Sequence, residues 1–345
     1  MSSDLPEKIS FLKVVETLLD AKSDYHSIHL SRFSDLEDAE SAILKEKWLL
    51  IDTKRRSRLI HDLKEIAEDD TLVCFDQVAL LALDDPEPSV RINAIELLWE
   101  YEHKCLIPIL VQMLQTDKVK DVRAAAATAL GKFIYLGEVE KISAESYQQA
   151  ETTLLNVLTG KDHKEVRQRA LEAISFSCHK EAQNQIRRAF ASEDTSWVAS
   201  SLFAMGRSAD MRWADMVLES LDHPELDVQL AAVRSAGELE LSKAREPLLT
   251  LLDQHDQFDE ELHNTIIWSL SQIGGESVRA ALELLMELAE EDEDDELLEY
   301  LETAIENLDF NEGMQFFELF DFDLPENGEE NGSDDLLLDD PEDDL

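Results

Sequence analysis

The segment Asp84–Leu98, DDPEPSVRINAIELL, places an acidic, proline-containing turn directly before Val-Arg and an alanine-bearing apolar stripe. The same order returns as TDKVKDVRAAAATAL from Thr116 and as KDHKEVRQRALEAIS from Lys161, and weaker copies follow. The anchor residues of the seven copies are Val90, Val122, Val166, Val198, Val228, Leu262 and Leu297, at intervals of 32, 44, 32, 30, 34 and 35 residues. A near-constant interval of this size predicts a repeat architecture.

Each copy has the apolar periodicity of a helix. Small or apolar residues stand four, five and eight positions after the anchor, and these offsets share one helical face. Small residues at the first of these positions, such as Ala94, Ala126 and Ala170, allow a neighbouring helix to approach closely. A second apolar helix lies between successive copies, so each unit is a hairpin that buries its apolar face only by stacking on the next. We therefore predict an all-α protein, a right-handed α-solenoid of about seven helical hairpins.

The phrase D-x-x-P-x-V-R-x-x-A, clearest between Asp84 and Ala94, resembles the HEAT repeat in its short bacterial form, first described in phycobiliprotein lyases. The resemblance covers roughly residues 70–310 and implies the fold. It leaves the function open, because lyases, base-excision glycosylases, assembly factors and scaffolds all use this repeat. Ala199, Gln229 and His263 replace the arginine of the earlier copies. Any ladder of arginines paired with loop carboxylates should therefore weaken after Arg167.

Three regions follow from this register. A helical N-terminal cap with a degenerate first repeat is expected at residues 1–70, the repeat array at 71–310, and an acidic tail at 311–345. The one long interval adds an insertion at residues 134–147, which we expect to be a loop carrying Tyr135 and other aromatic residues. Insertions map to one face of a solenoid, so this loop either belongs to a binding face or covers an apolar gap.

The tail joins an apolar cluster to a strongly acidic stretch. A segment so highly charged cannot offset its ordering entropy, so we expect the tail to be largely disordered. The apolar cluster, which includes Phe316, Phe317 and Phe320, either folds back as a C-terminal cap or stays free as a short binding peptide.

The charge of the chain limits its partners. There are 77 Asp and Glu against 31 Lys and Arg, a formal net charge of −46, and from Ala280 onward there are 27 acids and no base. Nucleic acids and anionic membrane surfaces are bound through basic patches, so neither is an expected direct partner. The densest positive cluster, Lys54–Arg58, holds the acidic tail, receives an acidic partner, or is a solvated helix face.

The N-terminus lacks the basic-then-apolar order of a secretory signal, and no apolar run approaches the roughly 20 residues of a membrane-spanning helix. Cys74, Cys105 and Cys178 are widely separated and sit in apolar contexts, which favours buried, reduced thiols. We expect a cytoplasmic protein.

Partner-binding candidates are aromatic and arginine residues at unusual repeat positions. Trp197 stands just before its anchor, where other copies carry Ser, Asp or Glu, and it suggests an exposed aromatic side chain. Arg207 and Trp213 lie in the same or the adjacent hairpin, and the repeat arginines Arg91, Arg123 and Arg167 lie on the second helix of their hairpins. These three arginines pair with loop carboxylates more readily than with a partner.

No catalytic, cofactor-binding or metal-binding constellation stands out, since the nine His are scattered and no P-loop, HExxH or GxSxG is present. The sequence therefore favours a non-catalytic protein-binding scaffold or adaptor that uses the concave face of the solenoid and the acidic tail. Two alternatives stay open: an enzyme of the bilin-lyase type built on the same repeats, and a polyanion mimic that acts through the tail.

Overall fold

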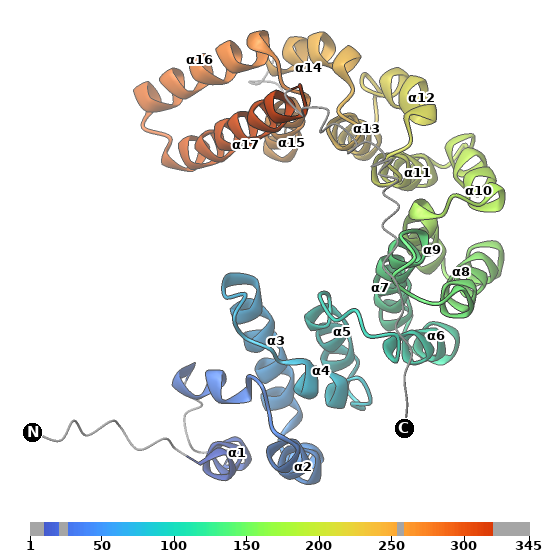
Figure 1. Cartoon of the computed structure of the whole chain (residues 1–345), viewed down its shortest axis with the longest axis vertical. Helices are drawn as coiled ribbons and strands as arrows, with labels where there is room; N and C mark the ends of the chain where they lie inside the picture. Colours follow the sequence, from blue (N-terminus) through green and yellow to red (C-terminus); the bar gives the residue numbers. More distant parts are fainter. Residues whose placement is uncertain (1–9, 21–26, 254–258, 320–345) are drawn as a thin grey trace, which may run out of the picture.

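The computed structural model describes residues 10–20, 27–253 and 259–319. These residues form 17 α-helices, joined by loops and short 3-10 helices, and no strand. The helices alternate between two rows that curve together into an open arch (Figure 1). The α-solenoid expected from the repeat is therefore confirmed.

Seven helical hairpins build the arch. The outer row consists of α4 (Asp76–Ala82), α6 (Leu106–Thr116), α8 (Ala144–Thr159), α10 (Lys180–Phe190), α12 (Ala214–Glu219), α14 (Arg245–Leu252) and α16 (Glu276–Asp292). The inner row consists of α5 (Pro88–Leu97), α7 (Lys120–Glu138), α9 (Lys164–Ala173), α11 (Thr195–Arg207), α13 (Leu226–Glu238), α15 (Glu260–Ile273) and α17 (Asp295–Leu319). The second helix of every hairpin thus lines the concave side, as the repeat register predicts (Figure 1).

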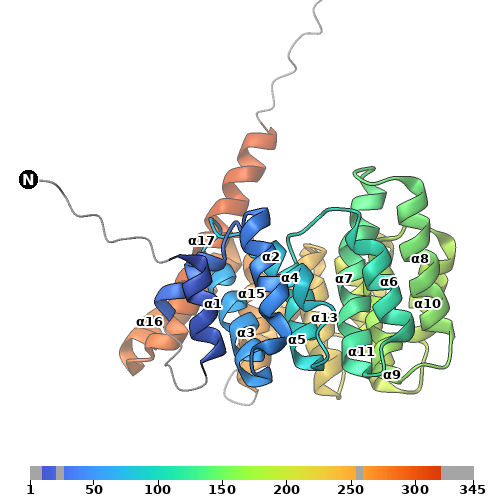
Figure 2. The same ribbon diagram turned by 90° about the horizontal axis from the view of Figure 1, so that it is seen from below.

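The N-terminal end carries three further helices, α1 (Phe11–Leu19), α2 (Asp38–Lys47) and α3 (Thr53–Asp69). Helix α3 continues the inner row and packs against α5, while α2 lies beside α4 (Figure 1). The pair α2–α3 is the degenerate first hairpin. At the opposite end, α17 continues to Leu319 and protrudes beyond one edge of the array (Figure 2).

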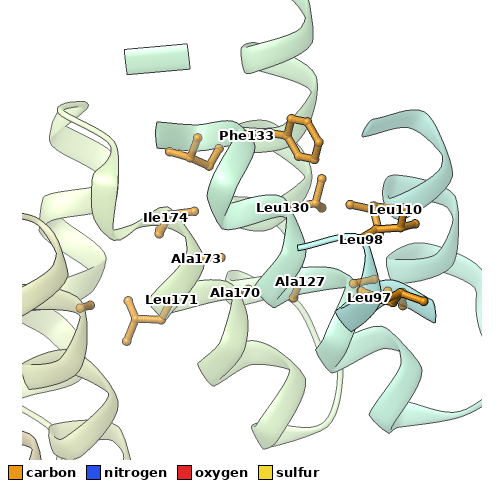
Figure 3. Packing of buried hydrophobic residues seen from close by; sticks show 14 of the residues in the cluster. Leu97, Leu98, Leu110, Ala127, Leu130, Phe133, Ala170, Leu171, Ala173 and Ile174 are labelled. Carbon is orange, nitrogen blue, oxygen red and sulfur yellow. The ribbon is translucent and has the colours of Figure 1, made fainter. Parts of the chain in front are cut away.

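Small residues bring the inner helices into contact. Ala94, Ala126 and Ala170 are completely buried. Ala170 lies with Ala127 in the continuous core between α7 and α9 (Figure 3). Farther along, the hydroxyl of Ser235 donates to the carbonyl of Leu202 at 2.7 Å. Such a bond requires helices α11 and α13 to approach almost backbone to backbone, and the serine satisfies its own buried hydroxyl by making it.

An arginine ladder ties one edge of the first hairpins together. The carboxylate of Asp85 receives the Nε of Arg56 at 2.7 Å. In the next hairpins Arg91 pairs with Asp117 at 2.8 Å, and Arg123 holds Asp162 through both Nε and Nη2. We call this the ladder edge; it contains the loops that lead from each outer helix to its inner helix.

The ladder weakens at Arg167 itself, one hairpin earlier than the sequence predicts. Arg167 donates from Nε to the carbonyl of Leu158 at 2.8 Å and makes no ion pair among the described residues. At the corresponding position of α13, the amide of Gln229 donates to the carbonyl of Leu221 at 2.9 Å. The bond to the hairpin's own loop is thus kept, while the link to the next hairpin is lost.

Two expectations are wrong in detail. The insertion at 134–147 is mostly helical, because its residues lengthen α7 and α8 and leave only a short connection after Glu138. Apolar residues such as Ile134 and Leu136 are buried, and burying them in a lengthened helix costs less than exposing them in a loop. The three cysteines are exposed rather than buried, since they fall at helix ends or in loops.

The cluster Lys54–Arg58 does not act as a unit. Arg56 is buried against Asp85, and Arg55 donates to the carbonyl of Thr17 at the end of α1. Lys54 and Arg58 line a shallow hollow of about 500 Å³ between α3 and α5. Half of this cluster therefore stabilises the N-terminal end of the array.

Candidate functional site on the concave face

Aromatic rings and guanidinium groups alternate along the concave face. We define the aromatic–arginine stripe as Tyr135, Phe176, Arg207, Phe203, Arg234 and Trp268. These residues come from α7, the turn after α9, α11, α13 and α15, so the stripe crosses five successive positions of the inner row. All six side chains are partly or fully exposed.

The stripe is continuous at ring-contact distance. The rings of Tyr135 and Phe176 meet edge to face with centroids 5.5 Å apart. The guanidinium of Arg207 lies 4.8 Å from the centre of Phe176 and 5.5 Å from that of Phe203. The guanidinium of Arg234 follows at 5.7 Å from Phe203 and 5.8 Å from the Trp268 ring. Cation–π attraction at these distances favours keeping the guanidinium groups beside the rings.

Two partly buried carboxylates lie beside the stripe. Burial raises the pKa of Glu172 and of Glu238, and nearby arginines oppose the shift in both cases. Burial in turn lowers the pKa of Arg207, against the attraction of Glu238 and Glu172. Arg234 pairs with Glu238 at 3.1 Å. The carboxylates of Glu172 and Glu238 therefore balance the positive charges of Arg207 and Arg234 in the stripe.

Gly206 makes room for this arrangement. A methyl group added there would lie 2.3 Å from Oε2 of Glu238 and 2.8 Å from the Cα of Ser235. Any side chain at this position would push α11 away from α13 and displace the Glu238 carboxylate. The glycine thus permits both the close helix contact and the acid beneath the arginines.

At its N-terminal end the stripe opens into a groove of about 1090 Å³, which we call the Trp99 groove. Helix α5 spans 10 residues and stops at Leu97, whereas α7 spans 19 residues, so the second half of α7 has no inner-row neighbour on that side. The chain after α5 then crosses the gap and carries Trp99 and Tyr101. The groove is lined by Lys64, Ala67, Glu68, Ile95, Glu96, Leu97, Leu98, Trp99, Glu100, Glu102, Ala125, Thr128, Ala129, Lys132, Tyr135, Phe176 and Arg207.

Lys132 holds the segment that displays Trp99. Its Nζ donates to the carbonyls of Leu98, Trp99 and Tyr101 at 3.0, 2.7 and 2.8 Å. Burial lowers the pKa of this ammonium to about 8, and the neighbouring acids Glu102, Asp76 and Glu100 act in the opposite direction. The Trp99 side chain itself is 63% exposed. A large aromatic ring is therefore presented to solvent on a fixed backbone.

Acidic side chains outnumber available basic ones around the groove. The ammonium of Lys64 pairs with Glu96 at 2.9 Å, and that of Lys132 donates to the three backbone carbonyls. Within the described part of the chain, Glu68, Glu100 and Glu102 make no direct ion pair, although Glu68 lies near Lys64 and the other two near Lys132. The rim of the groove is thus acidic around an aromatic and aliphatic floor.

A polar network at the edge opposite the ladder edge contains the serine, histidine and carboxylate side chains that a hydrolase uses, but not in a catalytic arrangement. The carboxylate of Glu151 accepts from Ser177 at 2.5 Å and lies 2.7 Å from Nδ1 of His179. Tyr147 donates to Glu138 at 2.6 Å, and burial together with this bond raises the tyrosine's pKa. Since Ser177 gives its proton to Glu151 and not to the imidazole, His179 is not placed as its base. Among the described residues no cluster of His, Cys, Asp and Glu has the form of a metal site.

The structure places the predicted partner-binding residues at separate locations. Arg207 lies in the stripe, whereas Arg91 and Arg123 are half-buried in the ladder, and Arg167 packs on Trp197 at 5.2 Å. Trp213 is 1% exposed, with Arg187 stacked 4.8 Å from its ring, because it fills the core at the start of α12. Trp213, predicted as a partner-binding residue, is therefore a core residue that the surface does not present to a partner.

The aromatic residues predicted in the tail lie at the limit of the structure. Phe316 and Phe317 belong to the last turns of α17, and Phe320 lies outside the described residues. The choice between a C-terminal cap and a free peptide stays open.

Sequence reasoning missed Trp99, Phe176, Phe203, Arg234 and Trp268. A signal was present for the last two, which stand six residues after their anchors, where earlier copies carry Glu96, Thr128 and Glu172. Trp99 had no such signal, because its exposure depends on how far α5 extends.

Comparison with known proteins supports the repeat assignment. The family model of HEAT repeats matches residues 77–144 and 214–306. No curated protein matches the chain. None of the described helices is both long and apolar enough to span a membrane.

Several solved structures are similar. The complex of CpcE and CpcF of phycocyanin lyase from Nostoc sp. PCC7120 matches at 19% identity and a TM-score of 0.44, over 68% of this chain and 94% of that chain. Human deoxyhypusine hydroxylase matches at 17% identity and a TM-score of 0.32, over 76% and 95%. Kap95p, solved with RanGDP, matches at 14% identity and a TM-score of 0.40, over 86% and 45%. At these identities the likeness concerns the fold alone. The two stretches that match the family model, residues 77–144 and 214–306, are HEAT repeats, and the seven-copy register continues the same pattern through the stacked hairpins between and around them.

Proposed function

We propose that the protein is a non-catalytic scaffold that binds a protein partner along its concave face. The observation that carries the proposal is the aromatic–arginine stripe, six aromatic and arginine side chains in unbroken contact across five successive positions of the inner row. Tyr, Trp and Arg dominate the energetics of protein interfaces, because they bury large areas and retain directional contacts. A solenoid offers them on an extended curved surface.

The charge pattern supports a protein partner over a nucleic acid. Each arginine of the stripe has a carboxylate beside or beneath it, so the stripe offers little net positive charge to phosphates. Guanidinium faces and rings instead suit the mixed apolar and polar surface of a protein segment. The acidic tail adds a second contact, or covers the concave face until a partner displaces it. We place this activity in the cytoplasm.

A second candidate rests on the Trp99 groove. Its volume of about 1090 Å³ and its aromatic lining match a site for a large, flat small molecule, as an enzyme of the bilin-lyase type would require. Protein purified from its native source separates the two readings. A coloured or ultraviolet-absorbing ligand held in the groove, without a stoichiometric protein, would favour the small-molecule function.

The scaffold function is tested by affinity capture with matched variants. Arg234→Ala and Trp99→Ala remove exposed side chains that make little contact with the core, and Glu219→Gln on outer helix α12 serves as the control. We expect a stoichiometric partner with the parent chain and the control, and at least a tenfold loss of recovered partner with each concave variant. Equal recovery with all three variants would place the interface elsewhere.

A further inference from the structure

The ladder changes its chemistry at the fourth rung. Arg56, Arg91 and Arg123 each reach the aspartate of the next hairpin's loop. At the next position that aspartate is Asp194, which pairs with Lys164 at 2.8 Å and caps α11 through the backbone of Ser196. The guanidinium of Arg167 lies 5.2 Å from the centre of the Trp197 ring. Trp197 therefore occupies the place beside the arginine that a carboxylate takes in the earlier hairpins.

A hollow of about 210 Å³ opens at this point, which we call the Arg167 hollow. Its walls are Leu158, Thr159, Arg167, Gln185, Arg188, Ala189, Ser192 and Trp197. Over the residues that the structure describes, neither Arg167 nor Arg188 makes an ion pair. Acids outnumber bases 77 to 31 in this chain, so two such arginines facing one hollow depart from its general pattern.

The walls define the ligand. Two guanidinium groups offer several N–H donors to one anion, in the fork geometry that suits a carboxylate. Leu158, Ala189 and Trp197 supply an apolar side, and the volume admits a single side chain but not a helix. We propose that the Arg167 hollow binds a carboxylate of an acidic peptide segment that also carries leucines.

Two sources supply this chemistry. Residues 320–345 of the chain itself hold 12 Asp or Glu, no Lys or Arg, and three successive leucines at Leu336–Leu338. A segment of another protein with the same composition would bind in the same way. The hollow lies on the ladder edge and shares no residue with the aromatic–arginine stripe, so it does not depend on the proposed scaffold function.

The chain itself supplies a conservative test variant. Gln229 already takes the place of the repeat arginine and keeps the bond to its own loop, so Arg167→Gln should keep the bond to Leu158 and lose the charge. Arg188→Gln removes the second cation. Lys180→Gln is the control, because it makes the same charge change at the other end of α10.

The probe is a fluorescein-labelled peptide with the sequence of residues 333–345, SDDLLLDDPEDDL, titrated at low salt and followed by anisotropy. A peptide with Asn and Gln for the acids is the negative control. The protein is the full chain, and in a parallel arm the full chain with Asp334, Asp335, Asp339 and Asp340 changed to Asn. Far-UV circular dichroism checks that each variant keeps its helical content.

Binding to the unmodified chain, weakened about tenfold by Arg167→Gln and by Arg188→Gln but not by Lys180→Gln, supports the site and shows that it accepts an external segment. Binding with the same pattern to the tail-neutralised chain alone supports the site and identifies the chain's own tail as its occupant. The proposal is overturned if neither protein binds the peptide, or if the two arginine variants bind it as tightly as the parent chain does.

Discussion

Replacing Asp85 with alanine should produce the largest loss of stability of any single substitution on the ladder edge. The Asp85 side chain is completely buried and accepts from Nε1 of Trp48 and Nε of Arg56, both at 2.7 Å. It also accepts from the backbone of Glu87 at 2.8 Å. Without it, the Arg56 guanidinium, whose side chain is 4% exposed, keeps its charge with no counter-ion. Removing one partner of such a pair costs about 3–5 kcal/mol.

The matched control is Asp162→Ala one step along the ladder. The Asp162 and Arg123 side chains are 18% and 13% exposed, so water replaces part of the lost interaction. We expect a cost of about 1–2 kcal/mol there. In the Asp85→Ala background, Arg56→Met should restore part of the stability, because it removes the uncompensated charge.

Native-state hydrogen exchange is the appropriate assay, because a repeat array opens locally and a single melting temperature would average over the arch. The amides of α3 and α5 should lose protection in Asp85→Ala by about 3 kcal/mol, and those of α15 should not change. A loss smaller than that caused by Asp162→Ala in α7 and α9 would refute the argument that burial decides the cost.

Three further outcomes follow from the structure. Burial lowers the pKa of Lys132 to about 8, below its value in the unfolded chain, so above pH 8 the unfolded state binds more protons than the folded state. Lys132 should therefore make the free energy of unfolding rise between pH 8 and 10. The fluorescence emission of Trp99 should titrate near pH 8 in the parent chain but not in Lys132→Met. Gly206→Ala should cost about 1–3 kcal/mol in chemical denaturation, through its contacts with Ser235 and Glu238, whereas Gly313→Ala, with no atom within 4 Å of the added methyl group, should cost little. A thiol reagent should titrate Cys74, Cys105 and Cys178 in the folded protein, slowly at Cys178, because its contact with Glu138 raises the thiol's pKa; a native chain with fewer than three reactive thiols would contradict their exposure.

Much of the fold could be predicted from local sequence because each hairpin repeats the same contacts. The anchor residues, the alanines four positions later and the loop carboxylates interact within one hairpin or with the next, so a single register determines them. The same register predicted that the ladder would weaken where Ala199, Gln229 and His263 replace arginine, but the last arginine–carboxylate pair is already Arg123–Asp162, because Arg167 stacks on Trp197. Whether an aromatic side chain is buried or exposed depends on tertiary packing, which the repeat register does not determine. Trp213 and Trp197 are both aromatic residues near a helix start, yet the first is a core residue and the second stacks on Arg167.

The candidate site was harder to predict, because its residues stand at positions where the repeats differ from one another. Arg207 could be named from sequence, but its neighbours Phe176, Phe203 and Arg234 meet only after three hairpins have stacked. The Trp99 groove exists because α5 has only 10 residues beside the 19 of α7, and the sequence pattern places such helix ends poorly. The insertion was expected to be a loop because it breaks the repeat period, whereas in the structure Tyr147 packs directly over Gly137 and joins the two lengthened helices.

The central claim is that the concave face, and not the outer row or the tail alone, holds a protein partner. Hydrogen exchange of the full chain with and without the captured partner tests it most directly, because it reports every helix at once. We predict slower exchange in α7, α11, α13 and α15 around the stripe and in the segment that carries Trp99, with α8, α10 and α12 unchanged. Slower exchange confined to the outer helices, or to residues after Leu319, would contradict the claim.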